Sequence, residues 1–311
     1  MTAPTSMNPY HVAGPIHDPA FFFGRDDQLR RILESAWQHH QSINVVGEAR
    51  SGKTSLLFRM LDSSVRARFV PNDIHSIYVY VNPELCPDPS SFFRFALDGV
   101  EKEHPGLLHV SQDAPITAAD LEAYLQGLLP HHLVLLVDNF ERMCDSPHFT
   151  SDFFDYLKGL AEHTEAYITM VVASRKHIHE LCPSDNLGSD FFGVFGEVRL
   201  GGFTPDEFEE FIEATSCTSG APMHLAHDAI LRLAGYYPYL AQMACSHVYD
   251  LWRKKGRLQP EDMATIQRKF QHDAHVHFEK VWIRHLSGPE RQVLGLLAQG
   301  RDAPTESILE D

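Results

Sequence analysis

The feature that most constrains the fold is a glycine-bounded loop between a short apolar run and a helical pattern. Residues 43–60 read INVVGEARSGKTSLLFRM, and residues 47–54 match the pattern GxxxxGK[ST] at every specified position. Glycines allow the backbone to curl so that successive N–H groups point inward and form a nest for an anion. The helix that follows adds its unsatisfied N–H groups and the positive end of its dipole. The stretch therefore predicts a phosphate-binding loop rather than an ordinary glycine turn.

Each residue type in this loop has a role in holding a nucleoside triphosphate. Lys53 supplies a flexible point charge for the terminal phosphates, and Thr54 offers a hydroxyl to Mg²⁺. We expect ATP or ADP, with Mg²⁺, to bind the following residues of the loop: Gly47, Arg50, Ser51, Gly52, Lys53, Thr54 and Ser55.

Strand-like and helix-like segments alternate up to about residue 200, which predicts an α/β fold with a parallel sheet sandwiched by helices. Most of the candidate strands are near-continuous apolar runs, as expected for strands covered on both faces. They span residues 43–46, 76–81, 132–138, 167–174 and 196–200, with helical segments at 120–129 and 151–163. Helices take over after residue 202, with predicted capping boxes at Thr204–Glu207 and Ser287–Glu290.

Two further strand ends are expected beside the phosphate loop, because ligands lie beyond the carboxyl ends of the strands in an open parallel sheet. The run LVLLVDNFERM ends its strand at Asp138, whose carboxylate can hold Mg²⁺. The run YITMVVASRK delivers Ser174 and Arg175, which either sense the γ-phosphate and offset its charge or simply meet water at a strand exit.

The composition is that of a globular protein and disfavours several other classes. The chain has 311 residues, 43% hydrophobic and 22% charged, and no apolar run of membrane-spanning length. Five scattered cysteines and the lack of a secretion signal lead us to expect a reduced, cytoplasmic protein without a membrane partner. The net charge of -16 argues against a nucleic-acid coat, although a solvated face or partner surface is locally basic at Arg253, Lys254, Lys255, Arg257, Arg268, Lys269, Lys280 and Arg284.

Together these pieces resemble the AAA+ superfamily of P-loop ATPases, and within it the STAND branch, the signal-transduction ATPases with numerous domains. The stretch FFFGRDDQLRRIL looks like the box that lies against the adenine, which implies that Phe23, Gly24 and Arg25 lie near the base. The stretch LAGYYPYLAQMACSHVYD is similar to the GxP-type lid motif, with one extra residue between Gly235 and Pro238. In such proteins the proline packs beside the nucleotide, which implies that Pro238 couples the lid to it.

The resemblance also implies the domain organisation. We expect a P-loop nucleotide-binding domain over residues 1–202 and a helical lid over residues 203–258. The C-terminal helices over residues 259–311 resemble the start of a winged-helix module, which in STAND proteins usually packs within the molecule.

One departure from the resembled pattern concerns hydrolysis. Many active AAA+ ATPases have a glutamate directly after the aspartate that ends the Walker B strand, and Asn139 stands there in this chain. The next acidic residue is Glu141, in DNFER, so either Glu141 is the catalytic base or hydrolysis is slow.

The function expected from these features is an ATP-binding molecular switch with slow hydrolysis, which controls lid position and assembly with itself or an effector. The alternative is a DNA-associated AAA+ regulator of the initiator or transposition type. A small-molecule kinase is disfavoured because the lid segment offers mainly Arg232, and a GTPase because no [NT]KxD box follows the Walker B strand. A zinc site at His272, His275 and His277 is also disfavoured, since His277 leaves the helix face of the first two.

Overall fold

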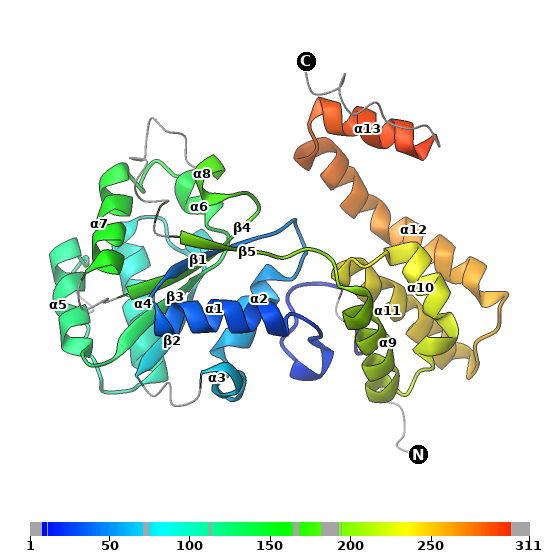
Figure 1. The fold of residues 1–311 in the computed structure, drawn as a ribbon, viewed down its shortest axis with the longest axis horizontal. Helices are drawn as coiled ribbons and strands as arrows, with labels where there is room; N and C mark the ends of the chain where they lie inside the picture. The colour runs from blue at the N-terminus through cyan, green and yellow to red at the C-terminus, as the bar shows by residue number, and fades with distance from the viewer. Residues whose placement is uncertain are drawn as a thin grey trace.

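The computed structural model describes residues 8–10, 12–70, 75–111, 114–163, 168–181, 193 and 195–299. An α/β unit is followed by a helical unit, as Figure 1 shows. The strands are β1 (Ser42–Val46), β2 (Ser76–Val81), β3 (His132–Val137), β4 (Ile168–Ser174) and β5 (Phe195–Arg199). These bounds lie within one residue of the predicted strands at each end.

The helices of the α/β unit are α1 (Asp26–Gln38), α2 (Lys53–Leu61), α3 (Ser63–Phe69), α4 (Pro89–Glu103), α5 (Ala118–Leu128), α6 (Glu141–Cys144), α7 (Ser151–Glu162) and α8 (Ile178–Leu181). Those of the helical unit are α9 (Pro205–Ser219), α10 (His227–Ala234), α11 (Pro238–Lys255), α12 (Asp262–Lys280) and α13 (Gly288–Ala298). Short 3-10 turns span Pro19–Phe21, Pro83–Leu85 and Met223–Ala226, and a π-helical turn spans Val281–His285.

The five strands form one parallel sheet in the order β2-β3-β4-β1-β5. Successive side chains of a strand face opposite sides of a sheet, and β2, β3 and β4 each contribute side chains to two cores. On β3, Leu133, Leu135 and Val137 pack with α4, α5 and α7, whereas Val134 and Leu136 pack with α1, α2 and α3. This double coverage explains the uninterrupted apolar runs and confirms the predicted α/β sandwich.

The helical unit has a core of its own, and the N-terminal segment belongs to it. Tyr10 is buried among α9 and α11 residues, and its hydroxyl hydrogen bonds to Ser219 Oγ at 3.2 Å. The Asn8 side chain donates to Ser246 O at 3.1 Å and to Asp250 at 2.9 Å. Residues 8–10 therefore pack on the helical unit, although we expected everything before residue 203 to belong to the α/β domain.

A second difference concerns the expected boundary between residues 258 and 259. Ile266, Phe270 and Ala274 of α12 are buried in the same core as α9, α10 and α11, so that boundary cuts through one packed unit. The capping boxes predicted at Thr204–Glu207 and Ser287–Glu290 are confirmed as the starts of α9 and α13. The remainder of the expected winged-helix-like segment, from residue 300, lies outside the described residues.

The cysteines differ from the expectation of a fully reduced chain. Cys86, Cys217 and Cys245 are free, but Cys144 is disulfide-bonded. Within the ranges given above, no helix is both long and apolar enough to cross a membrane, and no group of three His, Cys, Asp or Glu side chains could hold a metal ion.

Candidate nucleotide-binding site

The predicted phosphate loop connects β1 to α2 through a turn that uses positive φ angles. Arg50 has φ 67° and Gly52 has φ 99°, and the first of these is an uncommon conformation for a residue with a side chain. Gly52 is the N-cap of α2, and no side chain in the described part of the chain caps the helix. The first amides of α2 are therefore available to an anion, together with the positive end of the helix dipole.

Gly47 sits where the loop passes between the ends of two other strands. Its N–H donates to the carbonyl of Ser174 at 3.1 Å. A Cβ atom at this position would lie 2.6 Å from Ser51 Oγ and 2.7 Å from the carbonyl oxygen of Leu200. The first specified glycine of the motif is thus required by close packing.

Replacing Gly47 with alanine is expected to lower the free energy of unfolding by about 1–3 kcal/mol, because the Leu200 backbone must move to admit the methyl group. Urea denaturation measures this change. The matched control is Gly159→Ala on α7, where an added Cβ meets nothing within 4 Å. That control should be neutral or stabilise by up to about 1 kcal/mol; equal stabilities for the two variants would contradict the packing account.

Lys53 begins α2, and its ammonium group folds back over the loop. Nζ donates to the carbonyl oxygens of Gly47 at 2.6 Å and Glu48 at 2.9 Å. Burial lowers the pKa of the Lys53 ammonium, while the carboxylates of Glu141 and Asp138 act in the opposite direction. Anionic phosphate oxygens are stronger hydrogen-bond acceptors than these carbonyls. A phosphate in the loop would therefore compete successfully with the carbonyls for the Lys53 ammonium.

The two predicted Mg²⁺ ligands lie in direct contact. Thr54 Oγ1 donates to Asp138 Oδ2 at 2.7 Å, and Asp138 is only 2% exposed. The hydroxyl of Tyr80, at the end of β2, donates to the same oxygen at 3.0 Å. Burial and the neighbouring carboxylate raise the pKa of Tyr80, which keeps it a donor. Tyr80 could not be recognised from the sequence as a site residue, because it lies within an ordinary strand pattern.

Glu141 and Arg175, the predicted base and γ-phosphate sensor, form an ion pair. Arg175 Nε donates to Glu141 Oε1 at 2.7 Å. The carboxylate is mostly buried, whereas the guanidinium side chain is 48% exposed. Glu141 Oε2 is buried and has no hydrogen-bond partner among the described residues, so one oxygen of the carboxylate is held and the other is unused.

Ser174 does not take the place expected of a phosphate sensor. It is fully buried, and its hydroxyl oxygen lies 2.8 Å from Asn44 Oδ1 and 2.7 Å from the carbonyl of Lys176. The Ser174 hydroxyl therefore donates its proton to a protein acceptor, either on β1 or in the loop after β4. The geometry argues against the sensor role that the sequence suggested.

The phosphate loop, Glu141 and Arg175 all line one cavity of about 510 Å³, to which the helical unit also contributes. This volume is typical of ligand pockets. Pro238, Tyr239 and Gln242 of α11 lie on it, as do Phe21, Phe22, Phe23 and Phe203. Pro238 and Phe23, which were predicted to lie near the nucleotide, thus line the same cavity as the phosphate loop. Gln242 and Tyr239 also line it, although the sequence did not indicate them.

Two side-chain contacts join the helical unit to the phosphate loop. The hydroxyl of Tyr237 donates to the carbonyl of Ala49, and burial raises the pKa of Tyr237 to about 12. The Arg50 guanidinium lies 4.3 Å from the centre of the Tyr239 ring, a cation–π arrangement. The signal for these contacts was present in GYYPY, whose tyrosines flank Pro238.

Residues 12–16 contact the side chains of two residues that we expect to bind nucleotide, Arg50 and Ser55. The Ser55 hydroxyl accepts from the N–H of Ile16 at 2.9 Å. Arg50 Nη1 donates to the carbonyl of Val12 at 3.2 Å. Both side chains are thus used to hold residues 12–16 against the loop, and Ile16 itself lines the cavity.

Arg25, which we expect near the base, lines the cavity, and its polar groups are paired with protein groups. Arg25 is 4% exposed, and its guanidinium donates to the carbonyls of Gly201 at 2.6 Å and Gly202 at 3.3 Å. Its N–H donates to Glu207 at 3.0 Å, and a Cβ at Gly24 would lie 2.9 Å from the same carboxylate. This box therefore ties α1 to the linker between β5 and α9.

Several buried polar atoms of the cavity wall lack a hydrogen-bond partner among the described residues, which indicates what kind of ligand the cavity suits. Ser51 Oγ, Glu141 Oε2 and Gln242 Oε1 line it and have no hydrogen-bond partner within the described ranges. Leaving such a group unpaired costs about 1–3 kcal/mol, so the cavity is built for a polar ligand. The lining combines cationic side chains with aromatic rings, a combination that suits a Mg²⁺-nucleotide.

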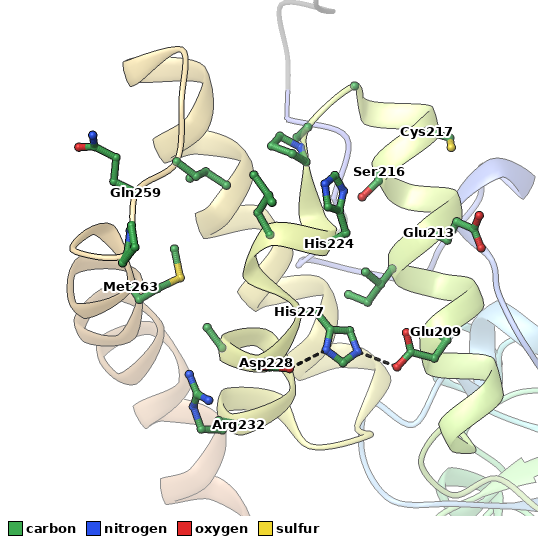
Figure 2. A pocket seen from close by; sticks show the side chains of 18 residues that line it. Glu209, Glu213, Ser216, Cys217, His224, His227, Asp228, Arg232, Gln259 and Met263 are labelled. Atoms are coloured by element: carbon green, nitrogen blue, oxygen red, sulfur yellow. Dashed lines mark hydrogen bonds and ion pairs between the residues drawn. The ribbon is translucent and has the colours of Figure 1, made fainter.

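A larger hollow of about 1320 Å³ lies elsewhere, within the helical unit (Figure 2). The ring of His227 bridges Asp228 at 3.0 Å and Glu209 at 2.7 Å there. Hydrogen bonding to Asp228, and then to Glu209, raises the pKa of His227. The described residues that line this hollow include none from the phosphate loop, so the larger volume does not mark the nucleotide site.

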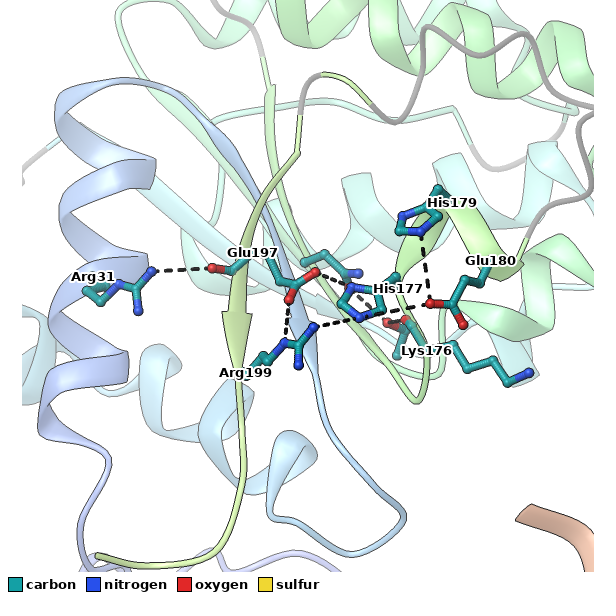
Figure 3. Close-up of polar contacts among 9 residues, drawn as sticks. Arg31, Lys176, His177, His179, Glu180, Glu197 and Arg199 are labelled. Carbon is teal, nitrogen blue, oxygen red and sulfur yellow. Dashed lines mark hydrogen bonds and ion pairs between the residues drawn. The ribbon is translucent and has the colours of Figure 1, made fainter. Parts of the chain in front are cut away.

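A charged cluster fixes the loop after β4, as Figure 3 shows. Glu197 of β5 accepts from Arg199 Nε at 2.8 Å and contacts the ring of His177, whose other nitrogen lies 2.9 Å from Arg199 Nη2. The cluster ties His177 to the edge strand β5. His177 lies two residues after Arg175, so the cluster helps to position the backbone from which that guanidinium emerges.

Comparisons with known proteins agree with this geometry. The profile of the Novel STAND NTPase 2 family matches residues 110–303, more than half of the chain. The profile of an AAA domain matches residues 35–181, which include the phosphate loop. No curated protein matches the chain.

Solved structures of low sequence identity share the fold. The Walker-type ATPase of Pyrococcus abyssi is 13% identical, with a TM-score of 0.62 over 86% of this chain and 76% of that one. The ORC2 protein of Aeropyrum pernix, solved with ADPNP and ADP, is 16% identical, with a TM-score of 0.59 over 79% and 67%. The ORC1 protein of the same organism, in complex with DNA, is 15% identical, with a TM-score of 0.55 over 90% and 73%.

The resemblance drawn from the motifs is thereby confirmed. The phosphate loop, the parallel sheet and the profile match point to the same family. This chain is a P-loop protein of the AAA+ type and belongs to the Novel STAND NTPase 2 family.

Proposed function

We propose that this chain is an ATP-binding switch, in which bound ATP with Mg²⁺ sets the position of the helical unit and slow hydrolysis resets it. The observation that carries the proposal is the shared cavity, lined by Lys53 and Thr54 from one unit and by Pro238 and Gln242 from the other. A ligand that contacts both units stabilises the arrangement in which both contacts are made.

The proposed roles follow the positions of the side chains. Lys53 and the first amides of α2 hold the terminal phosphates, and Thr54 and Asp138 hold the metal. Mg²⁺, when bound, neutralises phosphate charge and orients the phosphates. Glu141 orients water and accepts its proton through the oxygen that Arg175 leaves unused, and Arg175 faces the developing charge.

The proposed coupling runs through the contacts between the phosphate loop and α11. The Tyr237 hydroxyl donates to the carbonyl of Ala49, and the Arg50 guanidinium stacks on the Tyr239 ring. A change in the conformation of the phosphate loop therefore alters the contacts that hold the start of α11. Closure of one unit onto another around a bound ligand is a common switching movement. The partner of the closed form is proposed to be an effector or another copy of the chain.

Titration with nucleotide, followed by small-angle scattering and light scattering, tests the switch. The protein with ATP and Mg²⁺ is expected to differ in radius of gyration or in mass from the protein with ADP and from the free protein. ATP binding with identical scattering in all three states would contradict the switch while leaving nucleotide binding intact.

A DNA-associated regulator is the second candidate. Basic residues gather on α11, α12 and the turn between them, namely Arg253, Lys254, Lys255, Arg257, Arg268 and Lys269, and a protein of the same fold was solved with DNA. Binding to duplex DNA that weakens steeply with salt would favour this function. No binding at low salt would exclude it.

A further inference from the structure

We propose that Gln242 selects adenine in the nucleotide site by accepting a hydrogen bond from the exocyclic amino group of the base. This inference rests on the proposed function, because it assumes that the cavity holds a nucleotide. It goes further by assigning a base-reading atom, the side-chain oxygen Oε1 of Gln242.

The orientation of the Gln242 side chain is fixed by a single neighbour. Nε2 donates to the carbonyl oxygen of Phe21 at 3.4 Å. A backbone carbonyl only accepts, so the NH₂ end of the amide must face Phe21 and the oxygen must face the other way. The choice between the two amide orientations thus follows from chemistry.

The oxygen that results is buried and unused. Gln242 is 4% exposed and lines the cavity, and its Oε1 has no hydrogen-bond partner among the residues that the structure describes. A buried acceptor without a donor is costly, and such atoms in a pocket mark where a ligand supplies the missing group. The ligand must therefore present a donor at this point.

The surroundings of Gln242 suit a heteroaromatic ring. Phe21, Phe22, Phe23, Phe203 and Tyr239 line the same cavity. Lys53 and Arg175 also line it and carry the positive charges that phosphates need. Aromatic walls bind a flat ring through their faces and edges, and a small number of polar groups then fixes its identity.

Adenine and guanine differ at the atom in question. Adenine carries an amino group at position 6, which donates, whereas guanine carries a carbonyl oxygen there, which accepts. Oε1 pairs with the amino group and opposes the carbonyl, since two acceptors cannot share a hydrogen bond. A site that leaves a buried acceptor unpaired discriminates by about tenfold to a hundredfold.

The test is calorimetric titration of the full chain, in Mg²⁺, with four nucleotides: ATP, inosine triphosphate, N6,N6-dimethyl-ATP and 2′-deoxy-ATP. The wild-type protein is expected to bind the inosine and dimethyl analogues about 10–100-fold more weakly than ATP. Its affinity for the 2′-deoxy analogue should stay close to that for ATP. In Gln242→Met, which keeps the length of the side chain, the dissociation constants for ATP and for inosine triphosphate should agree within about threefold.

The control is Gln28→Met on α1. Gln28 Oε1 is likewise buried and without a partner in the described part of the chain, but Gln28 does not line the cavity. This variant is expected to keep the wild-type preference for ATP. A lost preference in both variants would show a general structural effect and overturn the assignment.

Other results overturn the inference without touching the proposed function. Equal binding of ATP and inosine triphosphate by the wild-type protein, with binding still lost in Lys53→Ala, would remove base reading but keep the nucleotide site. Sensitivity confined to 2′-deoxy-ATP would assign Oε1 to the ribose instead. If Gln242→Met does not fold, the wild-type comparison of the four nucleotides decides alone. Failure of every nucleotide to bind would refute the proposed function itself.

Discussion

Replacing Lys53 with alanine is expected to weaken ATP binding by at least about 100-fold, because it removes the charge-assisted contact to the terminal phosphates. The fold should survive, since Leu56, Leu57 and Met60 hold α2 in the core. Burial lowers the pKa of the Lys53 ammonium. The substitution therefore also removes a desolvated charge, whose burial is unfavourable to the folded state. Calorimetric titration with ATP and Mg²⁺ measures the affinity, and circular dichroism measures the fold.

Lys254→Ala is the matched control, because Lys254 is an exposed lysine near the end of α11. It should bind ATP as the wild-type protein does. Wild-type affinity in a folded Lys53→Ala variant would show that the loop is not the phosphate site.

Replacing Glu141 with glutamine is expected to lower the rate of ATP hydrolysis by about 100-fold or more, because an amide does not accept the proton of an attacking water. ATP binding should be retained, since glutamine keeps an oxygen that accepts from Arg175 Nε. Single-turnover hydrolysis of radiolabelled ATP measures the rate, and filter binding measures retention.

Glu162→Gln on α7 removes a carboxylate that does not line the cavity and that pairs with Lys158 at 3.7 Å. This control should hydrolyse ATP at the wild-type rate. Unchanged turnover in Glu141→Gln would assign the base to another group and refute the role given to the unused oxygen of Glu141.

Most of the fold was predictable because the three inner strands β1, β3 and β4 are buried on both faces. The run at residues 132–137 is buried at every position, which is typical of a strand that helices cover on both sides of the sheet. The contact between Thr54 and Asp138 was predictable for another reason, since the carboxyl ends of β1 and β3 lie at the same edge of the parallel sheet, on either side of β4.

The side-chain roles were less predictable, because they depend on contacts between distant segments. The position of Ser174 at the end of a strand predicted a hydroxyl available to a ligand, but this hydroxyl hydrogen bonds to Asn44 and the Lys176 carbonyl. Arg25 was predicted to lie near the base, but the sequence gives no sign that its guanidinium donates to the carbonyls of Gly201 and Gly202. Neither partner can be identified from sequence spacing.

Gln242 and Tyr80 were missed for a related reason. Each sits inside a regular element, where a polar residue at one position gives no local signal. Only the assembled fold shows that Tyr80 donates to Asp138 and that Gln242 presents an unpartnered oxygen to the cavity. The N-terminal segment is similar, because the burial of Tyr10 in the helical unit depends on α9 and α11.

Amide hydrogen exchange with and without ATP and Mg²⁺ tests most directly whether one nucleotide is held by both units. Slower exchange is expected in two separate segments, residues 47–55 of the phosphate loop and residues 237–242 at the start of α11, with no such slowing in Lys53→Ala. Unchanged exchange in either segment at saturating ATP would contradict binding by both units.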